Sequence, residues 1–481
     1  MITFLTRPLS RRTYALLGFG LMIFKYICEA TLISYFGGGF YSPVAFLLPL
    51  ISSKSAALQG TGSQLGVFLV VWSLPFVFVA LVFSIRRCID ASINPWAAFW
   101  VLCPVLNLLV MLGLCLLPSR FAPQLTVALP PTPSHRAVFD SMIAVLIGLA
   151  LGATMLSLGV YILRDYSTAL FFVTPILMGA VSSYHLAVAR PTKIGEALGI
   201  ASLCVTLGLA MMLLFALEGV VCIAMAAPIG YAGGGIGSVL GYAIAVSSSV
   251  HKRHWGAAVL LLPTVSLLEN FYSAPQVCVV NTAVEIDAPC QQVWQEVITF
   301  APISSVPTGW FRWGIAYPIR ARIEGYGVGA TRYCEFSTGS FEEPITAWEE
   351  PHRLTFNVTR QPAPLTELSP YRHVHAPHLD GFLSTQRGEF QLTELPGNRT
   401  RLEGRTWYTN EMYPQLYWRI WSDNIIHSVH MRVLSHIREQ AQRRAVELQA
   451  SIPTVLKPSQ NHLADTFAEY THETKAYRKP Q

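Results

Sequence analysis

Long apolar segments fill the first 275 residues, and alternating apolar and polar positions fill most of the chain that follows. A helix needs about 20 apolar residues to cross a bilayer. Segments of this kind lie at 14–36, 64–85, 96–117, 138–162, 167–189, 196–216, 219–247 and 256–274. The pattern predicts a multispan, polytopic transmembrane region of about eight helices at residues 1–275.

From Val277 the period changes to two, which is typical of half-buried β-strands. The first strand is expected at 279–286, a helix at 287–300 and a long amphipathic helix from about Pro414 to Val446. Further strands are expected at about 317–324, 329–337, 340–348, 353–360, 381–394 and 399–409. Residues 276–448 are therefore predicted to form an α+β helix-grip domain, with a curved antiparallel sheet around a long C-terminal helix.

Composition supports a division near residue 275. Only 13% of the residues are charged, against roughly 25% in soluble domains. Residues 1–275 hold 14 of 34 Lys and Arg and 7 of 28 Asp and Glu, which leaves 20 and 21 for the rest. The net charge is thus +7 (14 − 7) before the division and −1 (20 − 21) after it. The positive charge belongs to the loops of the membrane region and does not indicate a nucleic-acid partner.

Small and charged residues within the apolar segments are interpreted as packing features. Glycines recur every four residues in GGGIGSVLG (233–241), and this spacing lets membrane helices approach closely. Lys25 and Glu29, four positions apart, can neutralise each other. The nine cysteines include no CxxC pair, which argues against a zinc knuckle or a disulfide framework. Residues 449–481 are polar and aperiodic, and a disordered tail is expected there.

The side of the membrane follows from the basic residues and the number of spans. Arg7, Arg11 and Arg12 precede the first apolar segment, which predicts a cytoplasmic N-terminus. Eight spans would return the C-terminal domain to the cytoplasm. The same count leaves Arg190 and Lys193 outside, against the positive-inside rule, so one span more or fewer reverses the expected side.

Two segments resemble a known membrane family. They are SRRTYALLGFGLMIFKYICEA (10–30) and RRCIDASINPWAAFWVLCPVLNLLVMLGLCLLP (86–118), and they resemble the bacterial inner-membrane family called domain of unknown function 805. The resemblance covers residues 1–120 and implies a multi-pass inner-membrane protein with the turn at 86–90 in the cytoplasm. The usual histidine of that turn is Ile89 here, and the family brings no known activity.

The C-terminal segments resemble a second family. VEIDAPCQQVWQEVITF, RIEGYGVGATRYCEF, ITAWEEPHRLTFNV and RTRLEGRTWY follow one another in an order that resembles the START-like superfamily, also called SRPBCC or polyketide-cyclase-like. The resemblance implies a deep apolar cavity for a lipid, isoprenoid or polyketide-like ligand. Its members range from carriers and sensors to cyclases, so the fold leaves the function open.

Placing the more apolar face of each strand inward predicts the residues that line this cavity. Arg332 and Glu343 fall on neighbouring strands, where an interior ion pair would either orient a polar head group or be purely structural. Trp418 and Trp421 form a stripe on the closing helix that faces the cavity or the core. The predicted ligand-binding residues are Arg332, Cys334, Phe336, Glu343, Phe356, Phe382, Gln386, Phe390, Thr406, Tyr408, Trp418 and Trp421.

Histidines gather near the expected mouth of the cavity. The segment YRHVHAPHLDGF (371–382) is predicted to be a flap, and a histidine from it could meet an Asp/His/His stripe on the closing helix to form a zinc or iron site. The alternative is an ordinary polar helix flank beside a loop that gates the ligand. The alternative is favoured, with no metal and no cofactor expected. The metal candidates are His375, His378, Asp423, His427 and His430.

Taken together, the sequence favours a membrane-anchored protein that binds a hydrophobic small molecule for transfer, presentation or sensing. Its expected partners are the lipid bilayer and that ligand. The chain has no Ser-His-Asp or Cys-His order, nucleophile elbow or phosphate loop, so a non-catalytic role is favoured over a polyketide cyclase or hydrolase on the same fold. A transporter-like membrane region regulated by the C-terminal domain is a third interpretation.

Overall fold

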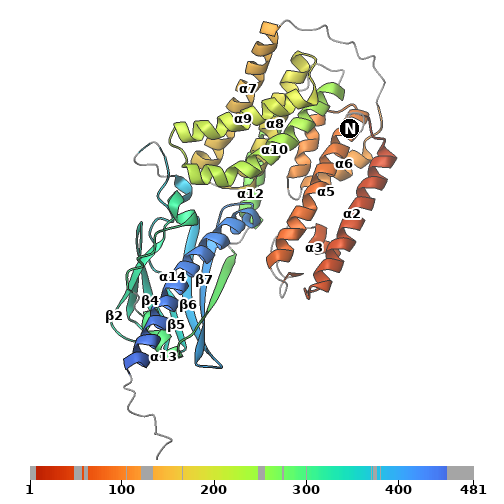
Figure 1. Ribbon diagram of the computed structural model, residues 1–481. Coiled ribbons are helices and arrows are strands. Elements are labelled where there is room, and N and C mark those ends of the chain that lie inside the picture. The colour runs from red at the N-terminus through yellow and green to blue at the C-terminus, as the bar shows by residue number, and fades with distance from the viewer. Residues whose placement is uncertain are drawn as a thin grey trace, which may run out of the picture.

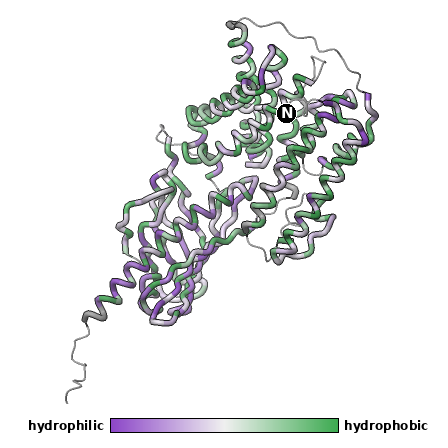
Figure 2. Tube along the Cα trace, turned by 45° about the vertical axis from the view of Figure 1, so that its right-hand side comes forward, coloured by the Kyte–Doolittle hydropathy of each residue, from purple (hydrophilic) through white to green (hydrophobic). Residues whose placement is uncertain are grey.

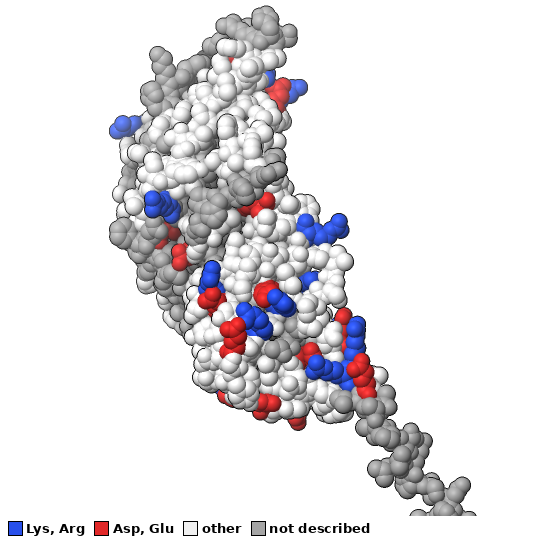
Figure 3. Space-filling model, turned by 90° about the vertical axis from the view of Figure 1, so that its left-hand side faces the viewer, with Lys and Arg blue, Asp and Glu red and all other residues white. Residues whose placement is uncertain are grey.

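The computed structural model consists of a bundle of helices followed by a domain with one β-sheet (Figure 1). The last helix of the bundle ends at Tyr272 and the first strand begins at Val277, where the hydropathy pattern changes. Figure 2 shows apolar residues concentrated in the bundle, and Figure 3 shows charged side chains gathered mainly on the sheet domain. The residues described are 7–47, 57–58, 63–103, 106–120, 134–164, 166–247, 255–272, 276–298, 301–369, 371, 376–379 and 381–451.

The bundle is built from six long helices and several short ones. The long helices are α2 (Arg11–Tyr35), α5 (Ser63–Asp90), α7 (Ser134–Leu156), α8 (Thr174–Ala189), α9 (Ile194–Leu214) and α10 (Val220–Ser247). The short elements are α3 (Pro43–Leu47), η1 (Pro95–Leu102), α6 (Leu106–Leu116), η2 (Ser157–Leu163), η3 (Ala169–Val173), α11 (Gly256–Val259) and α12 (Leu261–Tyr272).

Among the described residues, five helical segments are long and apolar enough to cross a membrane. They are Arg11–Tyr35, Ala137–Leu163, Ala169–Ala189, Ile194–Leu214 and Val220–Ser247. Each coincides with a predicted span, so the prediction of long apolar helices is confirmed for these five. The predicted span at 64–85 lies within α5, and the one at 256–274 is divided between α11 and α12.

Close helix packing in the bundle depends on glycine. A Cβ atom added at Gly237 would lie 1.9 Å from the carbonyl oxygen of Ile176, and one at Gly241 would lie 1.9 Å from that of Ala180. Any larger residue would therefore force α10 away from α8. The packing interpretation of GGGIGSVLG is confirmed. So is the pairing of Lys25 with Glu29, which form an ion pair on α2.

The segment 95–120 is a hairpin and does not span the bundle. Arg87, at the end of α5, is fully buried and donates from Nε to the carbonyl of Leu114 at 2.9 Å. The backbone N–H of Arg120 donates to the carbonyl of Asp90 at 2.7 Å. Both ends of this segment therefore lie beside the end of α5. Carbonyl groups of the segment accept hydrogen bonds from the buried guanidinium of Arg87. The prediction of one span at 96–117 is wrong.

The two ends of the bundle differ in what they contact. The end beside the sheet domain is called the proximal end, where the carbonyl of Tyr166 accepts from the N–H of Tyr413 at 2.8 Å. The opposite end is called the distal end and includes the start of α2, joined to Arg86 through the N–H of Leu9 at 3.2 Å. In the described chain, seven passes connect the two ends, formed by α2, α5, α7, α8, α9, α10 and the pair α11–α12 (Figure 1).

Contacts at both ends establish the last of these passes. Trp255, just before α11, donates from Nε1 to His185 near the distal end of α8 at 2.9 Å. Glu269 of α12 accepts from the backbone N–H of Thr168 at 2.8 Å, at the proximal end. The first helix therefore begins at the distal end, and the chain leaves the bundle for the sheet domain at the proximal end.

The sheet domain has the predicted antiparallel architecture. Seven strands form one sheet in the order β1-β7-β6-β5-β4-β3-β2, and the long helix α14 runs along one face of it (Figure 1). The strands are β1 (Val277–Ile286), β2 (Pro318–Glu324), β3 (Thr331–Phe336), β4 (Gly339–Glu349), β5 (Arg353–Asn357), β6 (Leu383–Leu395) and β7 (Arg399–Asn410). The helical elements are α13 (Cys290–Ile298), η4 (Gly309–Trp313), η5 (Pro377–Leu379) and α14 (Gln415–Ser451).

Buried and exposed residues alternate along the strands, and this places one apolar face of the sheet against the helices. Along β1 the even-numbered residues from Val280 to Ile286 are buried and their neighbours are exposed. Trp294 of α13 and Leu434 of α14 are fully buried in the resulting core. The closing helix extends to Ser451, past the start of the tail predicted at 449, and the rest of that tail lies outside the described residues.

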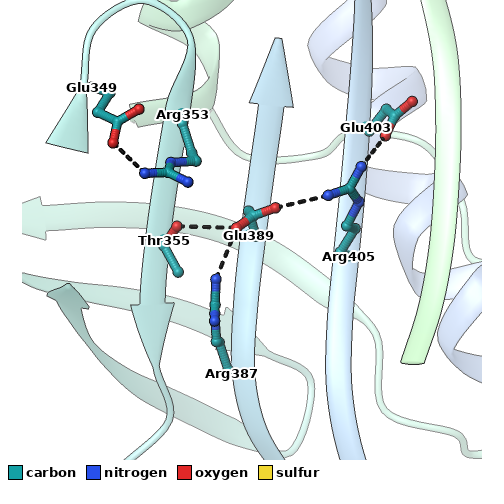
Figure 4. Close-up of polar contacts among 7 residues, drawn as sticks. All are labelled: Glu349, Arg353, Thr355, Arg387, Glu389, Glu403 and Arg405. Carbon is teal, nitrogen blue, oxygen red and sulfur yellow. Dashed lines mark hydrogen bonds and ion pairs between the residues drawn. The ribbon is translucent and has the colours of Figure 1, made fainter. Parts of the chain in front are cut away.

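The opposite face of the sheet carries a network of ion pairs (Figure 4). Glu389 of β6 is 6% exposed and accepts from Arg387 at 2.9 Å, from Arg405 of β7 at 3.2 Å and from the hydroxyl of Thr355 of β5 at 3.3 Å. A buried carboxylate is tolerated when its oxygens are paired in this way. The network thus ties three neighbouring strands together on the face away from α14.

Candidate functional site

A cavity of about 170 Å³ lies between the sheet and α14. Strands β3 to β7 supply one wall, α14 supplies another, and residues 361–364 also line it. Most of the lining side chains are apolar. They include Phe336, Phe341, Phe356, Phe390, Ile425 and Val429.

A buried ion pair interrupts this apolar lining. Arg332 and Glu343 are directly opposite each other on β3 and β4 and form a salt bridge, with exposed fractions of 2% and 6%. The guanidinium carbon of Arg332 also lies 4.9 Å from the ring centre of Phe356 and 5.5 Å from that of Phe390. Ring faces attract cations, so the two phenylalanines help to hold the charge in place.

Burial governs the protonation of the groups around this pair. Burial raises the pKa of Glu343, and the positive charge of Arg332 opposes that shift. Burial also raises the pKa of the Cys334 thiol to about 12, although Arg332 lowers it in part. Cys334 is therefore a neutral thiol near pH 7, whereas a nucleophilic cysteine has to be a thiolate.

A chain of hydrogen bonds forms the polar part of the other wall. Nε2 of His430 lies 2.7 Å from the hydroxyl of Thr406, and its Nδ1 lies 3.0 Å from the hydroxyl of Thr282. That hydroxyl also lies 2.8 Å from Nδ1 of His427. Neutral imidazole has one donor and one acceptor, which two hydroxyls can satisfy. Burial and the neighbouring His427 lower the pKa of His430 to about 4, so His430 is neutral near pH 7.

Seven of the predicted ligand-binding residues meet around the cavity. They are Arg332, Cys334, Phe336, Glu343, Phe356, Phe390 and Thr406. Sequence reasoning did not include Leu383, Thr385 or His430 among the lining residues, nor the loop at 361–364. The remaining predicted residues, which are Phe382, Gln386, Tyr408, Trp418 and Trp421, lie elsewhere.

Gln386 is exposed because β6 has a bulge. The pairing of β6 with β7 shifts register between Thr385 and Arg387, which leaves Gln386 as an extra residue. An extra residue reverses the alternation of faces along a strand. Thr385 faces the cavity as a result, and Gln386 points to solvent. The prediction of an inward Gln386 is wrong.

The other four residues are in the core or at the contact with the bundle. Tyr408 is fully buried, and its hydroxyl donates to Asp423 at 2.6 Å. Phe382 packs on Tyr166 with ring centres 4.9 Å apart, and Trp418 packs on Phe171 at 4.7 Å. Trp421 packs on Trp310. Trp418 is buried and Phe382 is partly buried, but both pack on the bundle and not on the cavity.

The loop-and-helix metal site, which the sequence left as the less favoured alternative, is not assembled among the described residues. Asp423 accepts from Tyr408 and from Nε of Arg419 at 3.1 Å, and His427 and His430 bind threonine hydroxyls. His378 faces the bundle, with Nδ1 3.3 Å from Glu218 and Nε2 3.2 Å from the sulfur of Cys222. His375 lies outside the described residues.

Solved structures similar to this chain match about a third of it. A protein from Nitrosospira multiformis is 17% identical, covering 35% of this chain and 99% of its own, with a TM-score of 0.23. A norcoclaurine synthase mutant from Thalictrum flavum, in complex with a transition-state analogue, is 10% identical over 36% and 99%, with a TM-score of 0.24. An aromatase/cyclase from Streptomyces sp. R1128 is 14% identical over 35% and 96%, with a TM-score of 0.23.

No family model matches the chain, and no curated protein matches it. The resemblance of residues 1–120 to domain of unknown function 805 has no support. At these identities and TM-scores, the similarities carry no argument about function.

The contribution of the Arg332–Glu343 ion pair to the free energy of unfolding can be tested by substitution. Replacing Arg332 by Met leaves Glu343 buried without its partner, and such a change costs roughly 3–5 kcal/mol of unfolding free energy. The double variant Arg332→Met/Glu343→Leu removes both charges and should recover most of that loss. Unfolding of the full-length protein in detergent, followed by tryptophan fluorescence, measures both. A double variant as unstable as the single one would contradict the assigned role of charge.

The lowered pKa of His430 predicts a pH dependence of stability. Below about pH 6.5 the unfolded chain takes up a proton that the folded chain refuses until about pH 4, so stability falls as pH falls through this window and is unaffected above it. The limiting loss is about 3 kcal/mol. His430→Gln should show a shallower decline in unfolding midpoint between pH 7 and pH 4.5. The exposed His352→Gln should follow the wild type, and equal slopes in all three would argue against the assignment.

Proposed function

We propose that this protein is a membrane-anchored binding protein that holds a small, largely apolar molecule between the sheet and α14, for transfer, presentation or sensing. The observation that carries the proposal is the apolar cavity with one buried ion pair in its wall. Pockets lined mainly by apolar groups, with a few placed polar groups, are typical of small-molecule sites.

The volume of the cavity limits the size of the ligand. Drug-sized ligands occupy pockets of roughly 300–1,000 Å³, and an engineered apolar cavity of about 150 Å³ binds benzene. At about 170 Å³, the cavity suits a molecule near the size of one aromatic ring, or one end of an isoprenoid or acyl chain. A whole lipid or polyketide would need more space than this.

The polar wall favours a neutral ligand with a hydrogen-bonding group. Arg332 and Glu343 balance each other, and His430 is neutral, so a charged ligand would enter a site without a matching charge. Burying an unpaired charge is costly. A hydroxyl or carbonyl group, in contrast, can share a donor or an acceptor of the wall.

Catalysis is less well supported than binding. The Cys334 thiol is neutral near pH 7, the hydroxyl of Tyr408 is already bonded to Asp423, and both ring nitrogens of His430 are bonded to threonines. A polyketide-cyclase-like reaction would need at least one acid or base that is free to exchange a proton with the substrate. Nothing in the described wall favours that role.

We further propose that the bundle crosses the bacterial inner membrane with its distal end in the cytoplasm and the sheet domain on the other side. The distal end holds Arg11, Arg12, Arg86, Arg120, Arg190 and Lys193. Among the described residues, the proximal connections at 36–47, 157–168 and 215–219 contain one basic residue, Arg164. The positive-inside rule then assigns the distal end to the cytoplasm. The earlier expectation of a cytoplasmic sheet domain rested on eight spans, and the hairpin at 95–120 removes one.

Ligand binding is tested by filling the cavity. Val429→Trp places a large side chain in the cavity wall, whereas Val446→Trp changes an exposed residue on the same helix. We expect a small molecule to co-purify with the full-length protein and with Val446→Trp, and to be absent from Val429→Trp, as measured by native mass spectrometry with extraction. Wild-type protein free of any bound molecule, or retention in Val429→Trp, would contradict the proposal.

Orientation is tested with reporter fusions. Alkaline phosphatase joined after Ser451 should be active, because it folds only outside the cytoplasm, while green fluorescent protein at the same position should stay dark. Fusions that end after Lys193, at the distal end, should give the reverse pattern. A fluorescent fusion at Ser451 would assign the sheet domain to the cytoplasm.

A further inference from the structure

Four chemically reactive side chains meet where the bundle contacts the sheet domain. Glu218 lies between α9 and α10, Cys222 lies in the first turn of α10, Glu367 follows β5 and His378 lies in η5. One potential ligand atom from each residue lies within 4.8 Å of those of the other three. The cluster is separate from the cavity lining, so it is independent of the ligand proposed above.

The contacts within the cluster centre on the sulfur and the imidazole. Sγ of Cys222 lies 3.1 Å from Oε1 of Glu367 and 3.2 Å from Nε2 of His378. Nδ1 of His378 lies 3.3 Å from Oε1 of Glu218. One ring nitrogen therefore faces the sulfur, and the other faces a carboxylate.

Two oxygens in the cluster are buried without a partner. Oε2 of Glu218 and Oε2 of Glu367 have no hydrogen-bond partner in the described part of the chain, and Glu218 is only 8% exposed. A buried carboxylate oxygen without a donor is unfavourable, and two carboxylates in one small space repel each other. A cation at the centre of the cluster would remove both penalties.

The backbone brings the second carboxylate into this position. A Cβ atom at Gly219 would lie 1.5 Å from Oε2 of Glu367, so only glycine lets that carboxylate approach. The N–H of Val220 donates to the carbonyl of Leu368 at 2.9 Å, which fixes the two segments beside each other. The main chain thus holds the segment of Glu367 beside Gly219, and the absence of a side chain at Gly219 leaves room for the carboxylate.

We propose that this cluster binds a Zn²⁺ ion through Sγ of Cys222, Nε2 of His378 and the carboxylate of Glu367. Thiolate, imidazole and carboxylate are the usual ligands of zinc, at about 2.0–2.3 Å. Ligand atoms at the corners of such a tetrahedron are about 3.5 Å apart. The present separations of 3.1 and 3.2 Å need to widen by only about 0.3–0.4 Å. Binding releases the thiol proton of Cys222 to solvent.

Glu218 is the positioning residue of this site. A carboxylate that accepts from the second ring nitrogen of a zinc-bound histidine fixes its tautomer and its orientation. The contact of Glu218 with Nδ1 of His378 has this form. The ion would join α10 of the bundle to the segment that carries residues 361–364 of the cavity.

The test uses full-length protein in detergent, stripped with a chelator and then given Zn²⁺ or Co²⁺. We expect about one zinc per chain by elemental analysis, and a thiolate-to-cobalt charge-transfer band in the near ultraviolet. Cys222→Ser should lose both the band and the zinc. Glu218→Gln should weaken zinc binding roughly 10–100-fold while keeping the band. The matched control Cys278→Ser should behave as the wild type.

The wild-type measurement decides the proposal even if a variant fails to fold. Wild-type protein that takes up no zinc from an excess would overturn it, because the cluster would then be only a hydrogen-bonded contact. Zinc that is retained in Cys222→Ser, or lost instead in His427→Gln, would assign the ion to another site. Neither result depends on whether a small molecule occupies the cavity.

Discussion

The contact between the proximal end of the bundle and the segment after β5 constrains the rest of the molecule. An irregular segment carries polar main-chain groups that must find partners. Here the N–H of Thr366 donates to Gly314 of the sheet domain at 2.8 Å, and the carbonyl of Leu368 accepts from Val220 of the bundle at 2.9 Å. The same segment supplies residues 361–364 to the cavity. The bundle, the sheet domain and the cavity therefore all contact one short stretch of chain.

Inside the cavity, the polar groups are paired before any ligand is present. Arg332 has both a carboxylate and two aromatic faces beside it, and the threonine hydroxyls hold His430. In the proposed binding site, groups held in this way would need little rearrangement when a molecule enters, so selectivity would rest on shape and on neutral polarity.

Local patterns predicted the sheet well, because alternation is a property of neighbouring residues. They failed at Gln386, since Ser384 to Gly388 include no apolar residue that would set the phase of the strand. Trp418 was correctly expected to be buried, yet hydrophobicity does not indicate which surface covers a side chain. The partners of His378 are more than 150 positions away in sequence, and no local pattern can report such a contact. Hydropathy likewise indicated that 96–117 is long and apolar enough to cross a membrane. It cannot show that the two ends of this segment lie at the same end of the bundle.

The hairpin at 95–120 adds residues to the bundle without adding a pass. It therefore does not change the end at which the chain leaves the bundle. Because both of its ends are held at the end of α5, this segment could lengthen, shorten or disappear in a related chain and every later helix would keep its direction. The short pass through α11 and α12 differs from the hairpin, because it carries the chain from the distal end to the proximal end. Its loss would remove few residues, yet the chain would then leave the bundle at the distal end, away from the proximal end that the sheet domain now contacts.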